Sequence, residues 1–536
     1  MVMAFDISTL PNDSESLKLI IADLQGQFTG LKDQHDKETG ILLEQIRHLR
    51  DKLFGRKSEK LPVDTDIQPL LLFDMPEPDD VEADEAEEEI PVPAHTRKKR
   101  GRKPLPADLP RIEVVHDIPD EEKTCKCGCE LTRIGEEVSE QLDIVPAKAQ
   151  VIKNIRPKYA CRNCEGVDDD GPTVKIAPVP LQIIPKSIAS PGLLAHVLTG
   201  KFVDSLPFYR QEKQFTRIGV DLTRSSMCNW AMKAAEACRP LYNLFQDAVL
   251  SGASINADET TVQVLKEPGK SPTSKSYMWI FRRGDPETPV LVYQYHPTRS
   301  AEVVSEFLCG YNGYVQTDGY SGYDFLDIDP NIRHIGCWAH ARRKFMDMVK
   351  ARGKNKKSGS ADVALSYIRK LYRIESEAKK RNLSHEEIFQ LRQEKAVPIL
   401  EEFQKWLFKR SLQTPPKGLL GKAISYTLRQ WNRLVGYVED GRLSPDNNAA
   451  ENAIRPFVIG RKNWLFSGTP EGAESSAIIY SLIETAKANF LEPYSYLRHI
   501  FEKIPAANSL EELDLLLPWN LDGKKLALAA MGKAVD

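Results

Sequence analysis

The N-terminal part of the chain carries apolar residues at heptad spacing. Leu17, Leu24 and Leu31 are seven residues apart, with Ile21 and Phe28 between them. After a change of phase near Thr39-Gly40, the pattern continues with Leu42, Ile46, Leu49 and Leu53. Residues 14–54, within a segment 1–56, are therefore predicted to form an interrupted coiled coil, which favours self-association. A long helix packed on its own domain is the alternative.

Farther along, helical spacing gives way to strand spacing. Residues 191–244 show the pattern of several short helices, and the strand-like period begins at Ser254. The predicted elements are strands at 254–265, 276–283 and 289–296, a helix at 301–311, a strand at 313–323, and a strand leading into a helix at 332–345. Three strands, a helix, a fourth strand, a helix and a fifth strand describe an RNase H-like core, which we place over 251–350.

A second helical region has an unusual polar segment after it. Residues 355–440 are rich in Leu, Lys, Arg and Glu and show no strand pattern. The sequence SPDNNAAENAIRP, from Ser444 to Pro456, then predicts a helix capped by Ser444, with Pro445 at its first position. Pro456 should end or kink this helix. Its side chains are mostly Asn and Ala, so a core-facing role does not explain Glu451.

Residues 176–250 contain a candidate DNA-binding motif. The stretch GVDLTRSSMCNWAMKAAE resembles the turn and second helix of a helix-turn-helix, with Gly219 in the turn and Thr223 as the cap. The exposed residues of that helix would be Arg224, Ser225, Ser226 and Asn229. A plain helical packing subdomain fits the pattern equally well.

Composition narrows the class of protein. The chain has 536 residues, 41% hydrophobic and 28% charged, as expected for several globular domains. Its apolar runs fall short of the roughly 18 residues that cross a membrane, and MVMAFDISTL lacks the features of a signal peptide. We therefore expect no membrane association and a cytoplasmic, nucleoid-associated location. In that setting, paired cysteines indicate metal binding rather than disulfides.

Charge is distributed very unevenly between residues 57 and 108. Ten of the sixteen residues from Asp74 to Glu89 are acidic, which predicts a disordered linker. The basic run RKKRGRK follows, and a basic, glycine-containing segment can lie along phosphates or enter a minor groove. Its candidate DNA contacts are Arg97, Lys98, Lys99, Arg100, Arg102 and Lys103. A solvated linker is the alternative.

Cysteines cluster in two turns within residues 109–175. CKCGCE supplies Cys125, Cys127 and Cys129, and CRNC supplies Cys161 and Cys164. Two such turns separated by a strand-like stretch predict a zinc-ribbon-like domain that holds one structural Zn²⁺. Cys127, Cys161 and Cys164 are three of the ligands, and either Cys125 or Cys129 is the fourth. Unligated core cysteines are the alternative.

Three acidic residues stand out against the predicted core. Asp258 lies within a strand, Asp318 ends a strand and Glu451 lies on the later polar helix. A charge in a central sheet is costly unless it is paired or coordinates metal. The first and fourth strands of an RNase H-like sheet are neighbours, so Asp258 and Asp318 should project side by side. With Glu451 they suit two Mg²⁺ or Mn²⁺ ions.

Four motifs carry a resemblance to a known family. At NADET, QTDGYSGY, GCWAHARRKF and NNAAENAIRPFVIGRKNWLFSGTPEGAESSAIIYSLIETAK, the sequence resembles the transposases of insertion-sequence family sixty-six. The resemblance extends to LFGRKSEK, the cysteine-rich domain and NFLEPYSYL, and so to nearly the whole chain. In that family the DDE carboxylates fall on Asp258, Asp318 and Glu451.

The resemblance implies DNA transposition by transesterification. Hydrolysis frees a 3′-OH at the element end, and that hydroxyl attacks target DNA. The implied partners are DNA, as terminal inverted repeats and target, and two small accessory proteins. The family's all-α insertion falls on 351–440, the helix with Glu on 441–490 and the family C-terminal segment on 491–536. The fold is thus expected to be a multidomain α+β arrangement, in which a coiled coil and a zinc-ribbon-like domain precede the interrupted RNase H-like core.

Further residues near the predicted site have two interpretations. Cys337 and His340 form a C-x-x-H motif, and many DDE transposases have a similar motif after the second Asp. The pair has either an architectural or DNA-positioning role, or His340 is simply a buried, hydrogen-bonded histidine. Arg455 is four residues beyond Glu451 and can hold it or a phosphate. The other cationic candidates for DNA contact are Arg342, Arg343, Lys344, Arg461 and Lys462, with Trp464 for base stacking.

Two rival functions remain open on sequence alone. A non-catalytic DNA-binding protein would keep the zinc domain and coiled coil without the chemistry, and the intact acidic triad argues against it. An RNase H-type nuclease would cut without joining, whereas separate DNA-binding modules and a coiled coil favour joining two ends.

Overall fold

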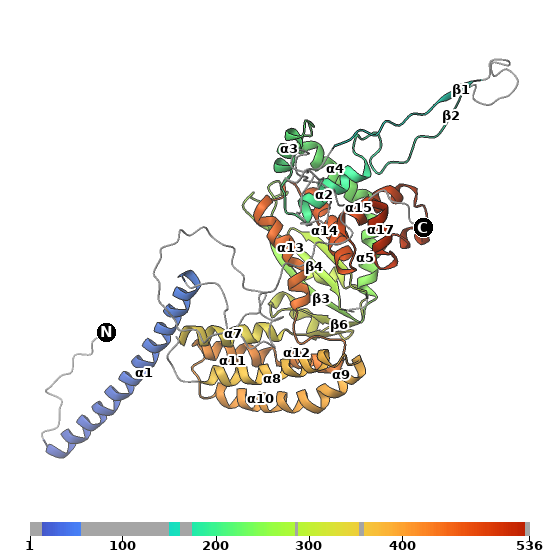
Figure 1. Ribbon diagram of the computed structural model, residues 1–536. Helices are drawn as coiled ribbons and strands as arrows, with labels where there is room; N and C mark the ends of the chain where they lie inside the picture. The colour runs from blue at the N-terminus through green and yellow to red at the C-terminus, as the bar shows by residue number, and fades with distance from the viewer. Residues whose placement is uncertain (1–12, 55–148, 161–173, 285–287, 353–358, 531–536) are drawn as a thin grey trace, which may run out of the picture. The chain divides into compact units, whose positions relative to one another are not determined.

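We analysed a computed structural model of the chain, which describes residues 13–54, 149–160, 174–284, 288–352 and 359–530 (Figure 1). The predicted linker, the basic run from Arg97 and the five cysteines of the two turns lie outside these ranges. The fold is mixed α+β and mostly helical, as predicted. Within the described ranges, no helix is both long and apolar enough to cross a membrane.

The heptad region forms one helix, α1 (Ser14–Phe54). It runs through Thr39-Gly40 without interruption, so the change of phase in the apolar pattern is not a break in the helix. A short antiparallel pair of strands, β1 (Lys158–Ala160) and β2 (Val174–Ile176), comes later in the chain.

Four short helices follow, as the apolar pattern predicted. They are α2 (Pro191–Phe202), α3 (Phe208–Arg217), α4 (Arg224–Ala237) and α5 (Arg239–Leu250). Gly219 has φ +79° in the turn between α3 and α4, a conformation that glycine adopts without strain. Thr223 caps α4, because its side chain accepts a hydrogen bond from the Ser226 amide at 3.2 Å. Arg224, Ser225 and Asn229 are exposed on α4, while Ser226 is half-buried.

A five-stranded mixed sheet forms the centre of the next region. Its strands are β3 (Ser254–Gln263), β4 (Lys275–Arg283), β5 (Leu291–His296), β6 (Gly313–Gln316) and β7 (Ile332–Ile335), in the spatial order β5-β4-β3-β6-β7. The first three strands are antiparallel neighbours, and β6 pairs parallel with both β3 and β7. The first and fourth strands of the sheet are therefore adjacent, as predicted. Helix α6 (Ala301–Phe307) joins β5 to β6.

The fourth strand is shorter than predicted. It ends at Gln316, so Asp318 lies two residues beyond it, and a 3₁₀ helix (Ser321–Asp327) occupies the rest of the predicted strand. The chain turns here because Asp318 Oδ1 accepts a hydrogen bond from the Tyr320 amide at 2.9 Å, the pattern of an Asx turn.

Alternation along β3 sends neighbouring acids to opposite faces of the sheet. Asp258 is directly across from Ile280 and Glu259 from Trp279. The Glu259 face meets the 3₁₀ helix, where Tyr323 packs edge-on against Trp279. The opposite face carries Asp258 and meets the helix that bears Glu451.

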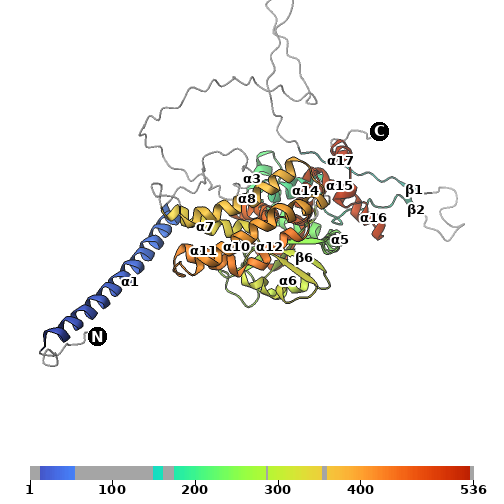
Figure 2. The ribbon, with the colours of Figure 1, turned by 90° about the horizontal axis from the view of Figure 1, so that it is seen from below.

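Helices between β7 and residue 440 build a second hydrophobic core. They are α7 (Trp338–Arg352), α8 (Ser360–Lys380), α9 (His385–Leu391), α10 (Val397–Ser411), α11 (Leu419–Arg429) and α12 (Trp431–Val435). Helices α8 and α11 pack beside α7, and α10 packs on α8 and α11 (Figures 1 and 2). In this core Trp338 stacks on Phe403, and Trp431 packs edge-on against both rings. The described part of residues 351–440 contains no strand.

Helix α13 (Asn448–Trp464) begins later and ends later than its sequence predicted. Asn447 occupies the N-cap position, so the helix does not start at Pro445. Pro456 does not end it, because Phe457 and Gly460 pack into the core and hold the following turns in place. Gly460 is needed there, since a Cβ atom would collide with the Tyr480 hydroxyl and the Trp464 ring.

The C-terminal helices cover the edge of the sheet and complete the core. They are α14 (Pro470–Ala488), α15 (Pro493–Lys503), α16 (Leu510–Asp514) and α17 (Gly523–Ala530). Side chains of α14 bond to the backbone of edge strand β5: Ser481 accepts from the Tyr293 amide at 2.8 Å, and Thr485 accepts from the Leu291 amide at 3.0 Å. This pairing protects an edge that would otherwise be free to associate.

Candidate active site

The three predicted acids come from three different elements. Asp258 lies in β3, Asp318 follows β6, and Glu451 lies in the first turn of α13. Asp258 and Asp318 are half-buried, and the Glu451 side chain is 14% exposed. The parallel pairing places Asn256 of β3 beside Gln316 at the end of β6, each two residues before its aspartate.

The carboxylates at this site repel one another. Burial raises the pKa of Asp258 well above its usual range, and the carboxylates of Glu259, Glu451 and Asp318 raise it further. Burial likewise raises the pKa of Glu451; Arg343 opposes this shift, whereas Asp446 and Asp318 add to it. The buried atom Glu451 Oε1 also has no hydrogen-bond partner. Concentrated carboxylate charge with an orphaned oxygen fits a divalent cation, which prefers oxygen ligands.

Glu259 is next to Asp258 in sequence, but its carboxylate is fully paired within the protein. Its side chain is 2% exposed and is bound by Arg299 and by the Tyr323 hydroxyl on the opposite face of the sheet. Arg299 in turn lies over the Tyr320 ring, 3.5 Å from its centroid. Because Arg299 and Tyr323 already compensate the buried charge of Glu259, this carboxylate does not need a metal ion and has a structural role.

Buried side-chain amides join the three elements that carry the acids. Asn256 Nδ2 donates to Gln316 Oε1 at 2.8 Å and to Asn447 Oδ1 at 3.1 Å. Asn447 Nδ2 donates to the Ala257 carbonyl at 2.9 Å, and Gln316 Nε2 donates to the Ser444 carbonyl at 2.8 Å. The network therefore fixes β3, β6 and the start of α13 relative to one another.

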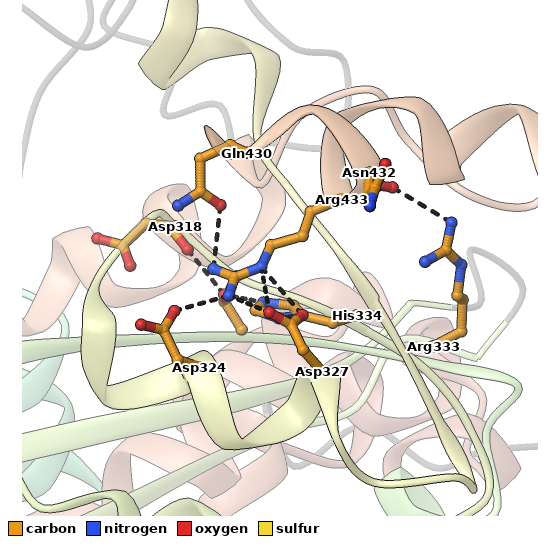
Figure 3. A network of polar contacts seen from close by, with 9 residues as sticks. Asp318, Asp324, Asp327, Arg333, His334, Gln430, Asn432 and Arg433 are labelled. Carbon is orange, nitrogen blue, oxygen red and sulfur yellow. Dashed lines mark hydrogen bonds and ion pairs between the residues drawn. The ribbon is translucent and has the colours of Figure 1, made fainter. Parts of the chain in front are cut away.

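A second polar network connects the helical region to the Asp318 segment (Figure 3). Arg433 of α12 donates to Asp324 at 2.6 Å and to Asp327 at 3.0 Å. His334 Nδ1 lies 2.9 Å from Asp327, and its Nε2 lies 2.8 Å from the hydroxyl of Thr317. Thr317 immediately precedes Asp318, so the network runs from the helices to the site.

His334 is neutral near pH 7. Burial lowers its pKa to about 4, and the charge of Arg433 acts in the same direction, while Asp327 opposes it. A neutral imidazole with Asp327 on its Nδ1 side donates from that nitrogen, and its Nε2 faces the Thr317 hydroxyl, which itself donates to the Asp318 carbonyl at 2.8 Å.

The helical region also contacts the backbone beside Asp318. At Gly319 any Cβ atom would fall within the ring of Tyr426 from α11. Glycine is therefore required for α11 to approach this closely.

The C-x-x-H pair lies against Glu451. Cys337 Sγ, His340 and Glu451 offer ligand atoms that all lie within 4.8 Å of one another. His340 Nδ1 is 3.6 Å from Glu451 Oε1, and Arg343 is 3.8 Å from the other carboxylate oxygen. Burial lowers the pKa of His340 to about 4, with Arg343 contributing, so the ring is neutral at pH 7.

The predicted cationic residues are placed in different surroundings. Arg461 is half-buried and donates to Thr260 and Thr261 of β3, at 3.2 and 3.0 Å, so part of its hydrogen-bonding capacity is used within the protein. Arg342 and Arg455 are half-buried, whereas Arg343 and Lys462 are exposed. Lys344 lies over the Tyr426 ring at 4.5 Å. Their contact with DNA stays a prediction.

Sequence reasoning missed the residues that hold the acids in place. The amides Asn256, Gln316 and Asn447 were not singled out, although Asn256 and Gln316 each precede a predicted acid by two residues. In a strand, that spacing places Asn256 on the same side of β3 as Asp258 and predicts the same for Gln316 and Asp318. A polar residue at that position in two adjacent strands was the available signal.

Four family models match the chain. One described as "Transposase IS66 family" matches residues 186–475, more than half of the chain. A second, "Transposase C of IS166 homeodomain", matches 41–114, and a third, "zinc-finger binding domain of transposase IS66", matches 122–165. The "IS66 C-terminal element" matches 481–519.

Similar full-length proteins occur in Sinorhizobium fredii (strain NBRC 101917 / NGR234). The uncharacterized protein y4jD is 32% identical over 97% of this chain and 99% of its own length. The uncharacterized protein y4qI is 29% identical over 97% and 99%, respectively. A third, y4hP, is 31% identical over 88% of this chain and 87% of its own length.

Proposed function

Because the chain belongs to the IS66 transposase family, we propose that it cleaves the ends of an insertion sequence and joins them to target DNA. One observation carries this proposal. Asp258, Asp318 and Glu451 come from three elements, yet the carboxylates of Asp318 and Glu451 are close enough to Asp258 to raise its pKa, and Asp318 also raises the pKa of Glu451. These three carboxylates are proposed to hold Mg²⁺ or Mn²⁺. The partial burial of all three acids, and the absence of a hydrogen-bond partner for Glu451 Oε1, support that assignment.

The sheet is proposed to be an RNase H-like core. Its spatial order, in which three antiparallel strands are followed by two parallel ones, supports this fold. One element differs from the expected order, since a 3₁₀ helix replaces a helix between the fourth and fifth strands. Helices α8 to α12 are proposed to be the family's insertion before the catalytic glutamate.

Each group near the acids has a defined task in this mechanism. Bound cations supply an activated nucleophile and stabilise the attacking and leaving oxygens of the phosphate. The amides of Asn256, Gln316 and Asn447 hold the three acids in register, so little motion is needed when DNA binds. Arg343, which is exposed and lies beside Glu451, is proposed to contact a DNA phosphate.

The remaining modules are proposed to select and pair the DNA ends. The zinc-finger region is proposed to hold one Zn²⁺, with the basic run before it following the phosphate backbone. Helix α4 is proposed to present Arg224, Ser225 and Asn229 to DNA. Helix α1 is proposed to bring two copies together, and two small accessory proteins of the element to assist.

A strand-transfer assay separates this function from its rivals. The protein is incubated with linear DNA carrying the element ends, with Mg²⁺ and the accessory proteins. Joined product supports transposition, cleavage without joining indicates a nuclease, and binding alone indicates a non-catalytic protein.

Variants at the acids test the site directly. Asp258→Asn, Asp318→Asn and Glu451→Gln should each abolish cleavage while retaining end binding, and exposed Asp204→Asn serves as the control. Cleavage at the normal rate by any one of the three would remove that residue from the site.

A further inference from the structure

Two buried atoms face each other beside the proposed metal site, and neither has a hydrogen-bond partner. They are Nδ1 of His340 and Oε1 of Glu451, which lie 3.6 Å apart. This distance is too long for a hydrogen bond between them. Unsatisfied buried polar atoms are rare in folded proteins, and such a pair indicates a missing common partner.

The surrounding residues narrow the identity of that partner. Arg343 lies against the other carboxylate oxygen, Oε2, at 3.8 Å, so it leaves Oε1 to the partner shared with His340. Cys337 Sγ lies within 4.8 Å of ligand atoms of both His340 and Glu451, but it already accepts a hydrogen bond from the Asn447 amide at 3.3 Å. The two atoms available to one ligand are thus an imidazole nitrogen and a carboxylate oxygen.

We propose that His340 Nδ1 is a further ligand of the divalent cation that Glu451 holds. Two ligand atoms that are each about 2.1 Å from one ion can be at most about 4.2 Å apart, and the observed 3.6 Å meets this condition. Both residues sit in the first turns of their helices, α7 and α13, and Gln316 Nε2 donates to the Gly336 carbonyl just before α7 and to the Ser444 carbonyl just before α13, at 3.2 and 2.8 Å. The inference rests on the proposed function, because it assumes that Glu451 binds the cation.

A nitrogen ligand has a consequence for metal selectivity. Mg²⁺ strongly prefers oxygen, whereas Mn²⁺ and later transition metals also accept imidazole. A site with His340 should therefore favour Mn²⁺ over Mg²⁺ more strongly than the three carboxylates alone would. Removal of His340 should weaken Mn²⁺ binding more than Mg²⁺ binding.

The test uses the full-length chain and Mn²⁺ alone, without DNA. Bound Mn²⁺ is counted by electron paramagnetic resonance, and pulsed measurements detect the coupling of a directly bound ¹⁴N nucleus to the ion. The variants are His340→Ala, Glu451→Gln and, as the matched control, His499→Ala, a half-buried histidine on α15. Thermal melts without metal verify that each variant is folded.

We expect the wild type and His499→Ala to show nitrogen coupling at the Mn²⁺ site. His340→Ala should lose this coupling and bind Mn²⁺ at least about tenfold more weakly, as loss of a group that supports a metal site generally does. Should His340→Ala misfold, His340→Gln replaces it, which keeps bulk but removes the ring nitrogen.

Two other outcomes have distinct meanings. If Glu451→Gln loses Mn²⁺ but His340→Ala binds it normally, or the wild type shows no nitrogen coupling, His340 is not a ligand and the inference fails. If Glu451→Gln itself binds Mn²⁺ normally, the proposed carboxylate site is wrong.

Discussion

Asn256 of β3 donates a hydrogen bond to Asn447, the residue that caps α13, at 3.1 Å. These residues precede Asp258 by two positions and Glu451 by four. The bond therefore links the strand that carries one proposed metal ligand to the helix that carries another, across 191 positions of sequence.

Loss of Asn447 should slow cleavage without unfolding the protein. Asn447→Ala removes the acceptor of Asn256 and the donor to Ala257, which costs about 1–3 kcal/mol for each buried group left unpaired. Displacement of Glu451 should lower the cleavage rate by about 10–100-fold and raise the Mg²⁺ concentration needed for half-maximal rate. Asn452→Ala, an exposed residue of α13, is the control. A normal Mg²⁺ requirement in Asn447→Ala would contradict a positioning role.

The sequence predicted the strands and their neighbours well, but not the connections made by polar residues. Alternation and turn residues marked β3, β4 and β5 closely, although β6 is shorter than predicted, and the adjacency of the first and fourth strands followed from element order. The predicted helix end at Pro456 was wrong. The local backbone preference of proline favours a helix end there, but the burial of Phe457 outweighs this preference. The positions of Asn256 and Gln316 two residues before the acids were visible in the sequence, but the partners of these amides could not be predicted, since they come from segments far apart in the chain.

The Asp258→Asn variant should be more stable than the wild type in the absence of metal. Burial and nearby carboxylates raise the pKa of Asp258, so its ionised form opposes folding. A raised pKa means that stability is present at low pH and is lost as pH rises through the folded-state pKa. The melting temperature of the variant should thus exceed that of the wild type by a few degrees at pH 8, with little difference at acidic pH.

Divalent metal should reverse the order of the two melting temperatures, so that the wild type becomes more stable than Asp258→Asn. Mn²⁺ should raise the melting temperature of the wild type and have little effect on Asp258→Asn, because binding to the folded state stabilises it. The exposed Asp204→Asn variant should behave as the wild type in both conditions. A wild type that metal does not stabilise would argue against an acidic cation site.

His334 should make the protein sensitive to acid. Its pKa falls from the ordinary 6.5 to about 4 in the folded state, chiefly through burial. A lowered pKa means that stability is full above pH 6.5 and is lost as pH falls toward 4. The loss should be on the order of 3 kcal/mol, measured by denaturant unfolding at successive pH values.

The variant His334→Gln should show a shallower decline over the same range. Some decline should remain, because burial also lowers the pKa of His340 to about 4. Equal slopes for the variant and the wild type would show that His334 is not the group that titrates.

Zinc content should depend on the two cysteine turns. The full-length protein should contain about one zinc per chain, and Cys161→Ser or Cys164→Ser should lose it. Cys309→Ser, an exposed free cysteine near α6, is the matched control. Comparison of Cys125→Ser with Cys129→Ser identifies the fourth ligand, since only one of them should lose the metal. A wild type without zinc would refute the assignment.

Self-association should depend on the apolar seam of α1. Ile21, Leu24, Phe28 and Leu31 follow one another at alternating spacings of three and four residues, and each is 45–70% exposed. A seam of this kind is stabilised by packing against the same seam of a second helix. Leu24→Asp with Leu31→Asp should therefore reduce the mass measured by light scattering to that of one chain.

The same double variant should bind a single element end but form no paired-end complex. Gln25→Asp with Lys32→Asp introduces the same residue one position along the helix and should leave pairing intact, because both positions are exposed and polar. If the Leu24 and Leu31 variant still pairs two ends at normal yield, the contact between copies lies elsewhere in the chain. The helices from α8 to α12 would then be the next region to test, since they belong to a separate hydrophobic core.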